Sequence, residues 1–102
     1  MLLLLHSMKK KDIWINMKNY SVNIKITPKK AVNDPRGTQV MNGLKNLGYD
    51  NLNQVSVGKY IVISINAENE KNCKQMITQA CEDFIANPLI EEYEIEISEN
   101  KQ

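Results

Sequence analysis

Apolar and polar residues alternate along several stretches of the chain, which is the pattern of strands with one buried face. In residues 20–26 every second position is apolar, and Pro28 follows. Residues 91–97 repeat this period of two, and residues 52–57 carry a weaker version of it. Residues 60–65 have Ile61, Ile63 and Ile65 at alternate positions but are also apolar on the other face, at Tyr60 and Val62. Because the side chains of a strand alternate between its two faces, these stretches predict four strands.

Two other stretches have helical spacing. The clearer one is predicted to bury a continuous apolar face, formed by Cys73, Met76, Ile77, Ala80, Cys81 and Phe84. Asn87-Pro88 ends this helix, because the residue before a proline is pushed out of helical geometry. The other helix is predicted to start at Asp34-Pro35, an N-cap followed by a proline at the first helical position. Its apolar stripe is formed by Val40, Met41, Leu44 and Leu47.

Glycines mark three further features. Gly48 follows the first helix as a predicted left-handed C-cap. Gly37 and Gly43 each cost about 1 kcal/mol relative to alanine within a helix. Either something packs closely against them, the sheet or another subunit, or both are simply tolerated. Gly58-Lys59 predicts a type II′ hairpin turn between residues 52–57 and 60–65.

The order strand, helix, strand, strand, helix, strand predicts an α+β fold, a ferredoxin-like βαββαβ two-layer sandwich. Both helices would cover one face of a four-stranded antiparallel sheet. The first strand would lie beside the last, which places Lys25 opposite an outward glutamate. Tyr60 and Val62 would point to the uncovered face. A central strand that is apolar on both sides predicts self-association or docking onto a larger protein.

The composition narrows the possible classes of protein. At 102 residues the chain has room for one domain, which we place at residues 17–102. Residues 1–16 lack periodicity and are interpreted as a disordered N-terminal extension. The net charge of +1 gives no electrostatic footprint for nucleic acid or an anionic membrane surface. Without a long apolar run or a signal peptide, the expected location is the cytoplasm.

Residues with catalytic chemistry are sparse. His6, the only histidine, lies in the extension, so the domain has no Cys-His or Ser-His pair. Cys73 and Cys81 are about 12 Å apart along one helix, too far for a disulfide, and are interpreted as buried thiols. Residues 37–45 lack the Gly-Lys-Ser/Thr ending of a phosphate loop. We therefore predict no catalytic, cofactor or metal site on this chain.

Several short motifs resemble one known family. They are Ala86-Asn87-Pro88-Leu89-Ile90-Glu91-Glu92-Tyr93, Asp34-Pro35-Arg36-Gly37, Leu47-Gly48 and Val57-Gly58-Lys59, and they occur in order across residues 20–97. Together they resemble the PurS family, the small accessory subunit of phosphoribosylformylglycinamidine synthase. The family often has glutamine where Arg36 stands, so a specific contact by residue 36 is in question.

The resemblance implies a role in purine biosynthesis as a subunit of an ATP-dependent, glutamine-hydrolysing ligase. A glutaminase partner would release ammonia and a synthetase partner, holding ATP and Mg, would use it on formylglycinamide ribonucleotide. This chain would bridge the two as a homodimer or dimer of dimers, without an active site of its own. The candidate contact residues are Arg36, Gly37, Gly58, Lys59, Tyr60, Val62, Asn87, Pro88 and Glu91.

One alternative function fits the same predicted fold. Small-molecule-sensing regulatory domains share this architecture, and fold does not determine function. Such a domain would bind an amino acid or nucleotide by itself and gain thermal stability from it. RNA binding fits poorly, because residues 60–65 contain one aromatic residue and no arginine.

Overall fold

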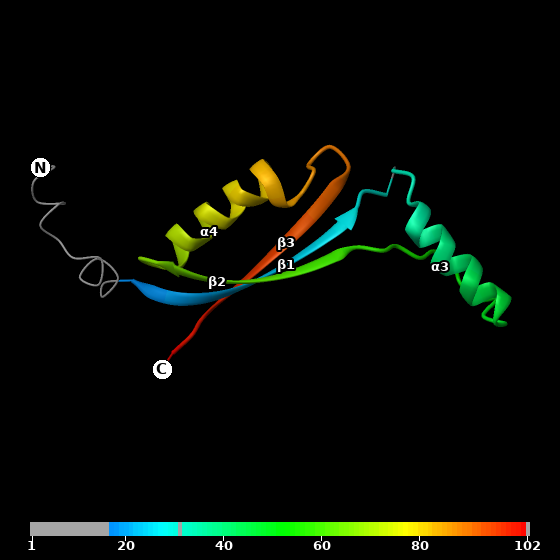
Figure 1. The fold of residues 1–102 in the computed structure, drawn as a ribbon, viewed down its shortest axis with the longest axis horizontal. Helices are drawn as coiled ribbons and strands as arrows, with labels where there is room; N and C mark the ends of the chain where they lie inside the picture. The colour runs from blue at the N-terminus through cyan, green and yellow to red at the C-terminus, as the bar shows by residue number, and fades with distance from the viewer. Residues whose placement is uncertain (1–16, 31, 102) are drawn as a thin grey trace, which may run out of the picture.

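The computed structural model describes residues 17–30 and 32–101, and a three-stranded antiparallel sheet forms its centre (Figure 1). The strands are β1 (Lys18–Pro28), β2 (Lys59–Ala67) and β3 (Glu91–Glu99), in the order β2-β1-β3. The first strand therefore pairs with the last, as predicted. The register places Lys25 opposite Glu94, which confirms the predicted cross-strand neighbours. The predicted extension, residues 1–16, lies outside the described residues.

The core lies on one face of β1. Tyr20, Val22, Ile24 and Ile26 are each at most 3% exposed. They are so well covered because β1 has a neighbouring strand on each side and a helix above it. The corresponding residues of the two outer strands pack against this core but are only partly buried: Ile61, Ile63 and Ile65 of β2, and Tyr93, Ile95 and Ile97 of β3.

The helix over the sheet is α4 (Glu70–Ala80), which continues into the π-helical turn η1 (Cys81–Ile85). Asn69 begins it, because its side-chain oxygen accepts a hydrogen bond from the Asn72 amide at 2.7 Å. Cys73, Ile77 and Cys81 of the predicted apolar face are buried against the sheet. The predicted helix and its buried thiols are therefore confirmed, whereas Met76, which was predicted on the same buried face, is 39% exposed.

Phe84 differs from its prediction. We expected it in the core, and the structure leaves it 90% exposed. The cause is the change from α-helical to π-helical bonding, seen where the Ala86 amide donates to the Cys81 carbonyl at 2.9 Å. In a π-helix each hydrogen bond joins residues i and i+5, which changes the angle between successive side chains around the helix axis. The i, i+3, i+4 pattern of an α-helix therefore no longer places residue 84 over the sheet.

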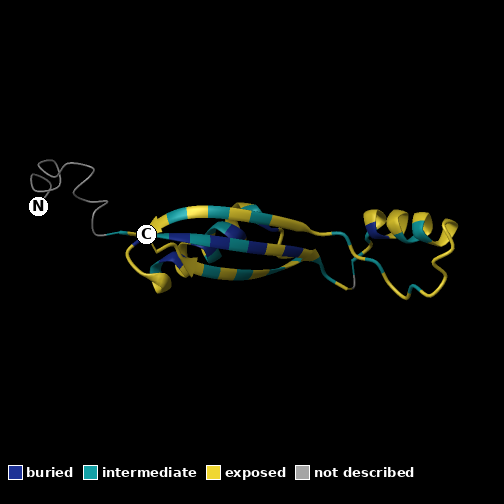
Figure 2. Cartoon of the chain, turned by 90° about the horizontal axis from the view of Figure 1, so that it is seen from below, coloured by how far each residue is buried: buried dark blue, intermediate teal, exposed yellow. Residues whose placement is uncertain are grey.

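The predicted position of the first helix is wrong. α3 (Pro35–Asn46) stands beyond the end of the sheet, so α4 alone covers the sheet face (Figures 1 and 2). Asp34 caps it and Gly48 follows it with a φ of 101°, both as predicted. The helix itself is thus local in origin. Its placement over the sheet was inferred from the expected topology alone.

The predicted second strand is also absent from the described part of the chain. Residues 52–57 return from α3 to β2 without pairing, so the sheet has three strands instead of four. Gly58 does not have the positive φ that a type II′ turn requires, because Gly48 is the one described glycine with such a φ. The chain therefore runs onward through Gly58 into β2 and does not reverse there. In the described residues, no helix is sufficiently long and apolar to cross a membrane.

Candidate functional site

The sheet and α3 meet at a junction held by one carboxylate. Asp34 Oδ1 accepts a hydrogen bond from the Gly37 amide at 3.0 Å, which caps α3. Its Oδ2 accepts from the Val57 amide at 3.2 Å, on the segment that returns to β2. The Asp34 side chain therefore binds both the start of α3 and the segment that leads from α3 back to β2. We call these two bonds the Asp34 clasp.

Gly37 allows the returning segment to pass against α3. A Cβ atom built on Gly37 would lie 2.2 Å from the Val55 carbonyl oxygen, closer than real Cβ contacts allow. Of the two explanations given for Gly37, close packing is therefore the correct one. The segment that packs against it is residues 52–57 of the same chain and not the sheet. At Gly43 a Cβ atom would meet nothing within 4 Å.

Gly58 is likewise constrained by a close approach. Its Cβ would lie 2.3 Å from the Ile26 carbonyl oxygen, where the returning chain meets the end of β1. Next to it, Lys59 Nζ lies 3.7 Å from Glu91 Oε2, which links the ends of the two outer strands. Because more than half of the lysine side chain is exposed, the ion pair contributes under about 1 kcal/mol.

The turn before β3 is stabilised by its own polar groups. Glu91 Oε1 accepts a hydrogen bond from the Asn87 amide at 2.7 Å. The Asn87 side-chain oxygen accepts from the Leu89 amide at 3.2 Å, and Pro88 lies between them. The predicted contact residues Asn87, Pro88 and Glu91 therefore shape a turn. That turn presents Leu89, which is 84% exposed.

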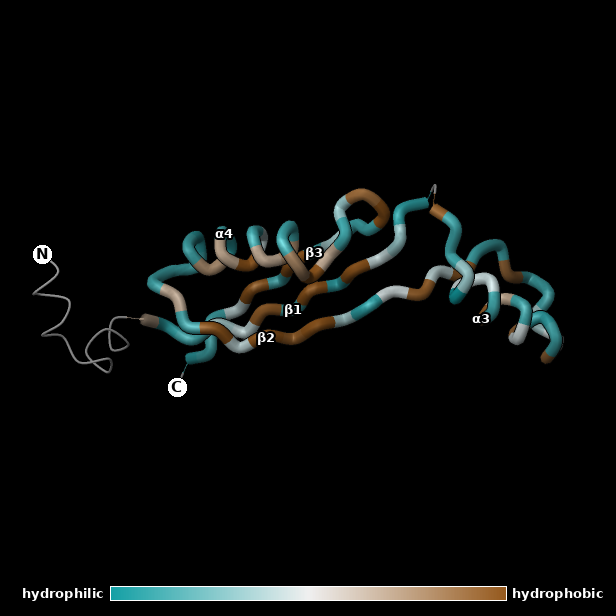
Figure 3. Tube along the Cα trace, turned by 45° about the horizontal axis from the view of Figure 1, so that its top comes forward, coloured by the Kyte–Doolittle hydropathy of each residue, from teal (hydrophilic) through white to brown (hydrophobic). Residues whose placement is uncertain are grey.

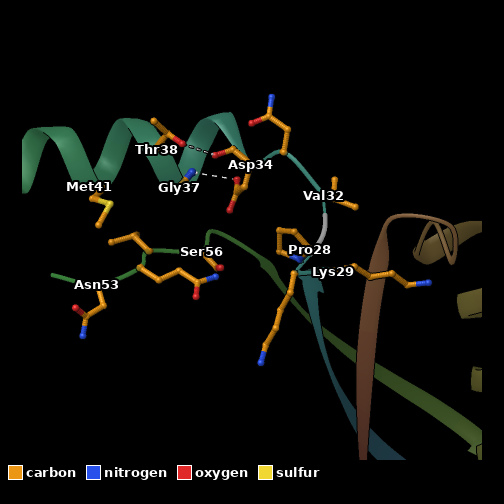
Figure 4. A pocket seen from close by; sticks show the side chains of 13 residues that line it. Pro28, Lys29, Val32, Asp34, Gly37, Thr38, Met41, Asn53 and Ser56 are labelled. Carbon is orange, nitrogen blue, oxygen red and sulfur yellow. Dashed lines mark hydrogen bonds between the residues drawn. The ribbon is translucent and has the colours of Figure 1, made fainter.

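Two shallow cavities flank the Asp34 clasp. The first, of about 290 Å³, is lined by Arg36, Gly58, Lys59 and Glu91, among others. The second, of about 240 Å³, lies between α3 and residues 53–56 and includes Gly37 (Figure 4). The structure thus gathers Arg36, Gly37, Gly58, Lys59 and Glu91 around one junction, although they come from separate parts of the sequence.

The acidic groups at this junction have partners within the chain, whereas Arg36 forms no ion pair there. Asp34 and Glu91 use both of their carboxylate oxygens within the chain. Arg36 is exposed and forms no ion pair with any residue in ranges 17–30 and 32–101. Lys29 and Lys30, which line the second cavity, form none within the described residues either. The charged groups that this junction leaves free are therefore cationic, with Arg36 in the first cavity.

The two remaining predicted residues lie elsewhere. Tyr60 and Val62 are 59% and 62% exposed on the open face of the sheet. They are paired in register with Lys25 and Asn23 of β1. Their predicted orientation toward the uncovered face is confirmed, and Tyr60 lines a hollow there together with Gly58 and Lys59.

Reactive groups in the described residues show no catalytic arrangement. Burial raises the pKa of the Cys73 and Cys81 thiols, with the neighbouring carboxylates Glu70 and Glu82 adding to the shift. The Tyr93 hydroxyl donates a hydrogen bond to Glu82 at 2.8 Å, and this bond raises the pKa of Tyr93. No group of three or more histidine, cysteine or acidic residues is placed to hold a metal ion, as far as the described residues extend.

Comparison with known proteins identifies the class. The family model described as PurS, phosphoribosylformylglycinamidine (FGAM) synthase, matches residues 21–99. The FGAM synthase subunit PurS of Synechocystis is 40% identical over 80 residues, covering 78% of this chain and 80% of the relative. The crystal structure of Methanocaldococcus jannaschii PurS is 34% identical with a TM-score of 0.70, covering 80% of this chain and 99% of that one.

A chain from a larger assembly also matches. In the structure of PurLQS from Thermotoga maritima, a chain is 28% identical with a TM-score of 0.73, covering 80% of this chain and all of that chain. The fold and the matched length define a small α+β subunit of a multi-subunit ligase. This chain belongs to the PurS family and is a subunit of FGAM synthase in purine biosynthesis.

Sequence reasoning missed two features of the junction. It identified Asp34 as a helix cap but not as the link to Val57, because a bond across 23 residues leaves no local pattern. It also placed no weight on Leu89 and Ile90, whose exposure follows from the turn at Pro88. Two apolar residues directly after a turn-forming proline were the signal available for them.

Proposed function

We propose that this chain carries no active site and acts as the bridging subunit of FGAM synthase. Dimers, or dimers of dimers, hold a glutaminase subunit against a synthetase subunit so that ammonia passes from glutamine to formylglycinamide ribonucleotide. ATP and Mg belong to the synthetase subunit, and this chain holds no cofactor. The complex works in the cytoplasm.

The observation that carries the proposal is the full-length likeness to a chain of PurLQS. This chain has 102 residues and matches all of a chain from such an assembly. A subunit of that kind requires surfaces that bind its partner subunits, whereas a ligand pocket is not required. The junction cavities, at about 240 and 290 Å³, lie below the roughly 300–1,000 Å³ typical of ligand pockets. At the junction itself, this size favours a contact surface over a ligand-sensing site.

The contact surface that we propose for the larger partners is the junction with its adjoining turn. It includes Arg36, Gly37, Gly58, Lys59, Asn87, Pro88 and Glu91. Tyr60 and Val62, on the open sheet face, form a second candidate contact. Arginine is enriched at binding hot spots, and Arg36 is the junction arginine, engaged by no ion pair in the described residues.

Arg36→Ala is expected to weaken assembly with the glutaminase and synthetase subunits by about tenfold, a loss of roughly 1.4 kcal/mol. The measurement is sedimentation of the purified subunits at several concentrations. Lys45→Ala is the matched control, because Lys45 is the basic residue of the last turn of the same helix, away from the junction. The two variants should unfold at the same temperature. Equal assembly by both would remove Arg36 from the contact surface.

Adding ATP, ADP or glutamine to this chain alone separates the bridging role from ligand sensing. A bridging subunit shows no rise in thermal stability at millimolar ligand. A sensing domain gains RT ln(1 + [L]/Kd), which is about 2.7 kcal/mol at a hundredfold excess over Kd. A gain in thermal stability of that size would contradict the bridging role and support the small-molecule-sensing alternative.

A further inference from the structure

We propose that residues 1–16 fold back over the open face of the sheet, the face away from α4, and cover it within the same chain. This cover is additional to the bridging role and gives the open face an occupant that belongs to the chain itself. A partner that binds Tyr60 and Val62 must then first displace the segment. Residues 1–16 themselves lie outside the described residues.

The open face carries a row of carboxylates along β3. Figure 3 shows hydrophobic and hydrophilic positions alternating along β1, which separates the buried face of the sheet from the open one. The outward, exposed positions of β3 include three glutamates, which we call the glutamate row: Glu92, Glu94 and Glu96. Lys25 lies opposite Glu94 and is the one basic residue that strand alternation places on this face. Three carboxylates against one lysine give the face a net charge of −2.

The glutamate row has no cationic partner in the part of the chain that the structure describes. None of its three carboxylates, and not Lys25 either, forms an ion pair with a described residue. Successive outward residues of a strand are about 7 Å apart, which is within the Debye length of about 8 Å at physiological ionic strength. The carboxylates therefore repel one another, and a basic segment laid along β3 would relieve that repulsion.

The sequence of residues 1–16 is complementary to this face. Residues 9–11 are three lysines and Asp12 is the one acidic residue, so the segment has a formal net charge of +2. Apolar residues lie on either side of the lysines, in residues 2–5 and 13–15. On the open face, the Tyr60 side chain is 59% exposed and offers apolar surface for such residues to cover. The segment therefore supplies both the charge and the apolar groups that the face lacks.

The point where the segment joins the sheet allows its lysines to reach the glutamate row. The segment leads into β1 at Lys18, at the end of the sheet opposite α3 (Figure 1). The β1 positions paired with Glu96 and Glu94 lie about 17 and 24 Å from that end, at 3.4 Å per residue. An extended chain that turns back at residue 17 has residues 9–11 about 20–27 Å along the face. If two residues are used in the turn, the lysines move back by about 7 Å and still lie over the row.

The tether and the charges favour the chain's own segment over a second copy. A short flexible tether gives a segment an effective concentration in roughly the millimolar range at its site, against about 10 μM for a second copy in solution. The open face of a second copy carries the same net negative charge, so two open faces repel each other. The occupant that satisfies both conditions is the basic segment attached to the same sheet.

Fluorescence tests the contact without a label, because Trp14 is the only tryptophan of the chain. We expect acrylamide to quench Trp14 about twofold more strongly in the Glu94→Gln, Glu96→Gln double variant than in the unmodified chain, because exposed ion pairs are lost. The matched control is Asp50→Asn with Glu70→Gln, which removes two carboxylates outside the strands and should leave the quenching unchanged. Sodium chloride at about 0.5 M should raise the quenching of the unmodified chain and not that of the Glu94, Glu96 variant. Far-UV circular dichroism should be equal for all three chains.

Cysteine cross-linking tests whether the contact forms within one chain. A chain that carries Lys10→Cys and Glu94→Cys should form an internal disulfide after mild oxidation, seen as a monomer that has lost two maleimide-reactive thiols. Cys73 and Cys81 are buried, so the introduced cysteines react selectively. The matched control is Lys10→Cys with Gln75→Cys, because Gln75 is exposed on α4 at the other face of the sheet. The control should not form the internal disulfide.

The outcomes decide whether the segment covers its own sheet. Glutamate-dependent quenching together with an internal disulfide at residue 94 supports the cover. Equal quenching in all three chains, with equal linking to residues 94 and 75, shows a segment without a preferred site, as predicted for a disordered extension, and overturns it. A disulfide formed only between copies makes the segment a contact for a second copy and also overturns it. These measurements use this chain alone, so their failure leaves the bridging role standing.

Discussion

Ile24→Ala is expected to lower the free energy of unfolding by about 2–5 kcal/mol. Ile24 has no exposed surface, and it lies in the middle of the central strand under α4. The substitution removes buried methyl groups and leaves a cavity that the paired strands cannot close. Small domains are stable by only about 5–15 kcal/mol, so this loss is a large fraction of the total stability and raises the unfolded fraction at 37 °C.

Urea denaturation followed by circular dichroism measures this loss. Asn23→Ala is the matched control, because residue 23 belongs to the same strand, lies next to Ile24 and points to the open face. The control should change the unfolding free energy by less than about 0.5 kcal/mol. A loss below 1 kcal/mol for Ile24→Ala would show that the core does not lie on this face of β1.

Gly37→Ala is expected to destabilise α3 and its junction by about 1–3 kcal/mol, although alanine ordinarily favours a helix. The added Cβ would lie 2.2 Å from the Val55 carbonyl oxygen and 2.6 Å from Asp34 Oδ2. Either the returning segment moves away or the Asp34 clasp opens, and both expose cavity-lining residues. The normal gain of about 1 kcal/mol from replacing a helical glycine is therefore reversed.

Amide hydrogen exchange of α3 measures this effect, since the helix stands apart from the sheet and can open locally. Gly43→Ala is the matched control, because its Cβ meets nothing within 4 Å in the same chain. Both substitutions are made separately in the otherwise unmodified chain. Gly43→Ala should slow exchange and Gly37→Ala should accelerate it. The same direction for both would contradict the close approach at Gly37.

The sequence predicted the parts of the fold that depend on local periodicity. The alternation in residues 20–26 identified the central strand, because its buried face is continuous and a proline ends it. The spacing of Cys73, Ile77 and Cys81 identified the helix that covers the sheet. The pairing of the first strand with the last also followed, since an antiparallel sheet with these elements has few other arrangements.

The features that were not predicted depend on long-range contacts. Residues 52–57 have strand-like apolar positions, but the Val57 amide is bound to Asp34 and pairs with no strand. Gly58 has the residue type of a tight turn, whereas the structure uses it for close passage past Ile26. A glycine has both uses, and the sequence does not distinguish them. The predicted position of α3 over the sheet came from the expected four-stranded topology and not from any local pattern.

The candidate site was predicted in part. Motif positions at Arg36, Gly58, Lys59 and Glu91 are far apart in sequence and line one cavity in the structure. Tyr60 and Val62 lie on the open face of the sheet, which adjoins the junction where Tyr60 lies beside Gly58 and Lys59. Family membership explains why these motifs occur in one chain. The Asp34 clasp joins two of the segments, 34–37 and 57–59, and the Lys59–Glu91 ion pair links the third.

The most direct test of the bridging role is synthesis of formylglycinamidine ribonucleotide from glutamine by the purified glutaminase and synthetase subunits, with and without this chain. The same reaction driven by ammonium is the control. We predict that glutamine-driven synthesis requires the chain, while ammonia-driven synthesis proceeds without it. If the chain changes neither glutamine-driven synthesis nor assembly of the subunits, the bridging role is wrong.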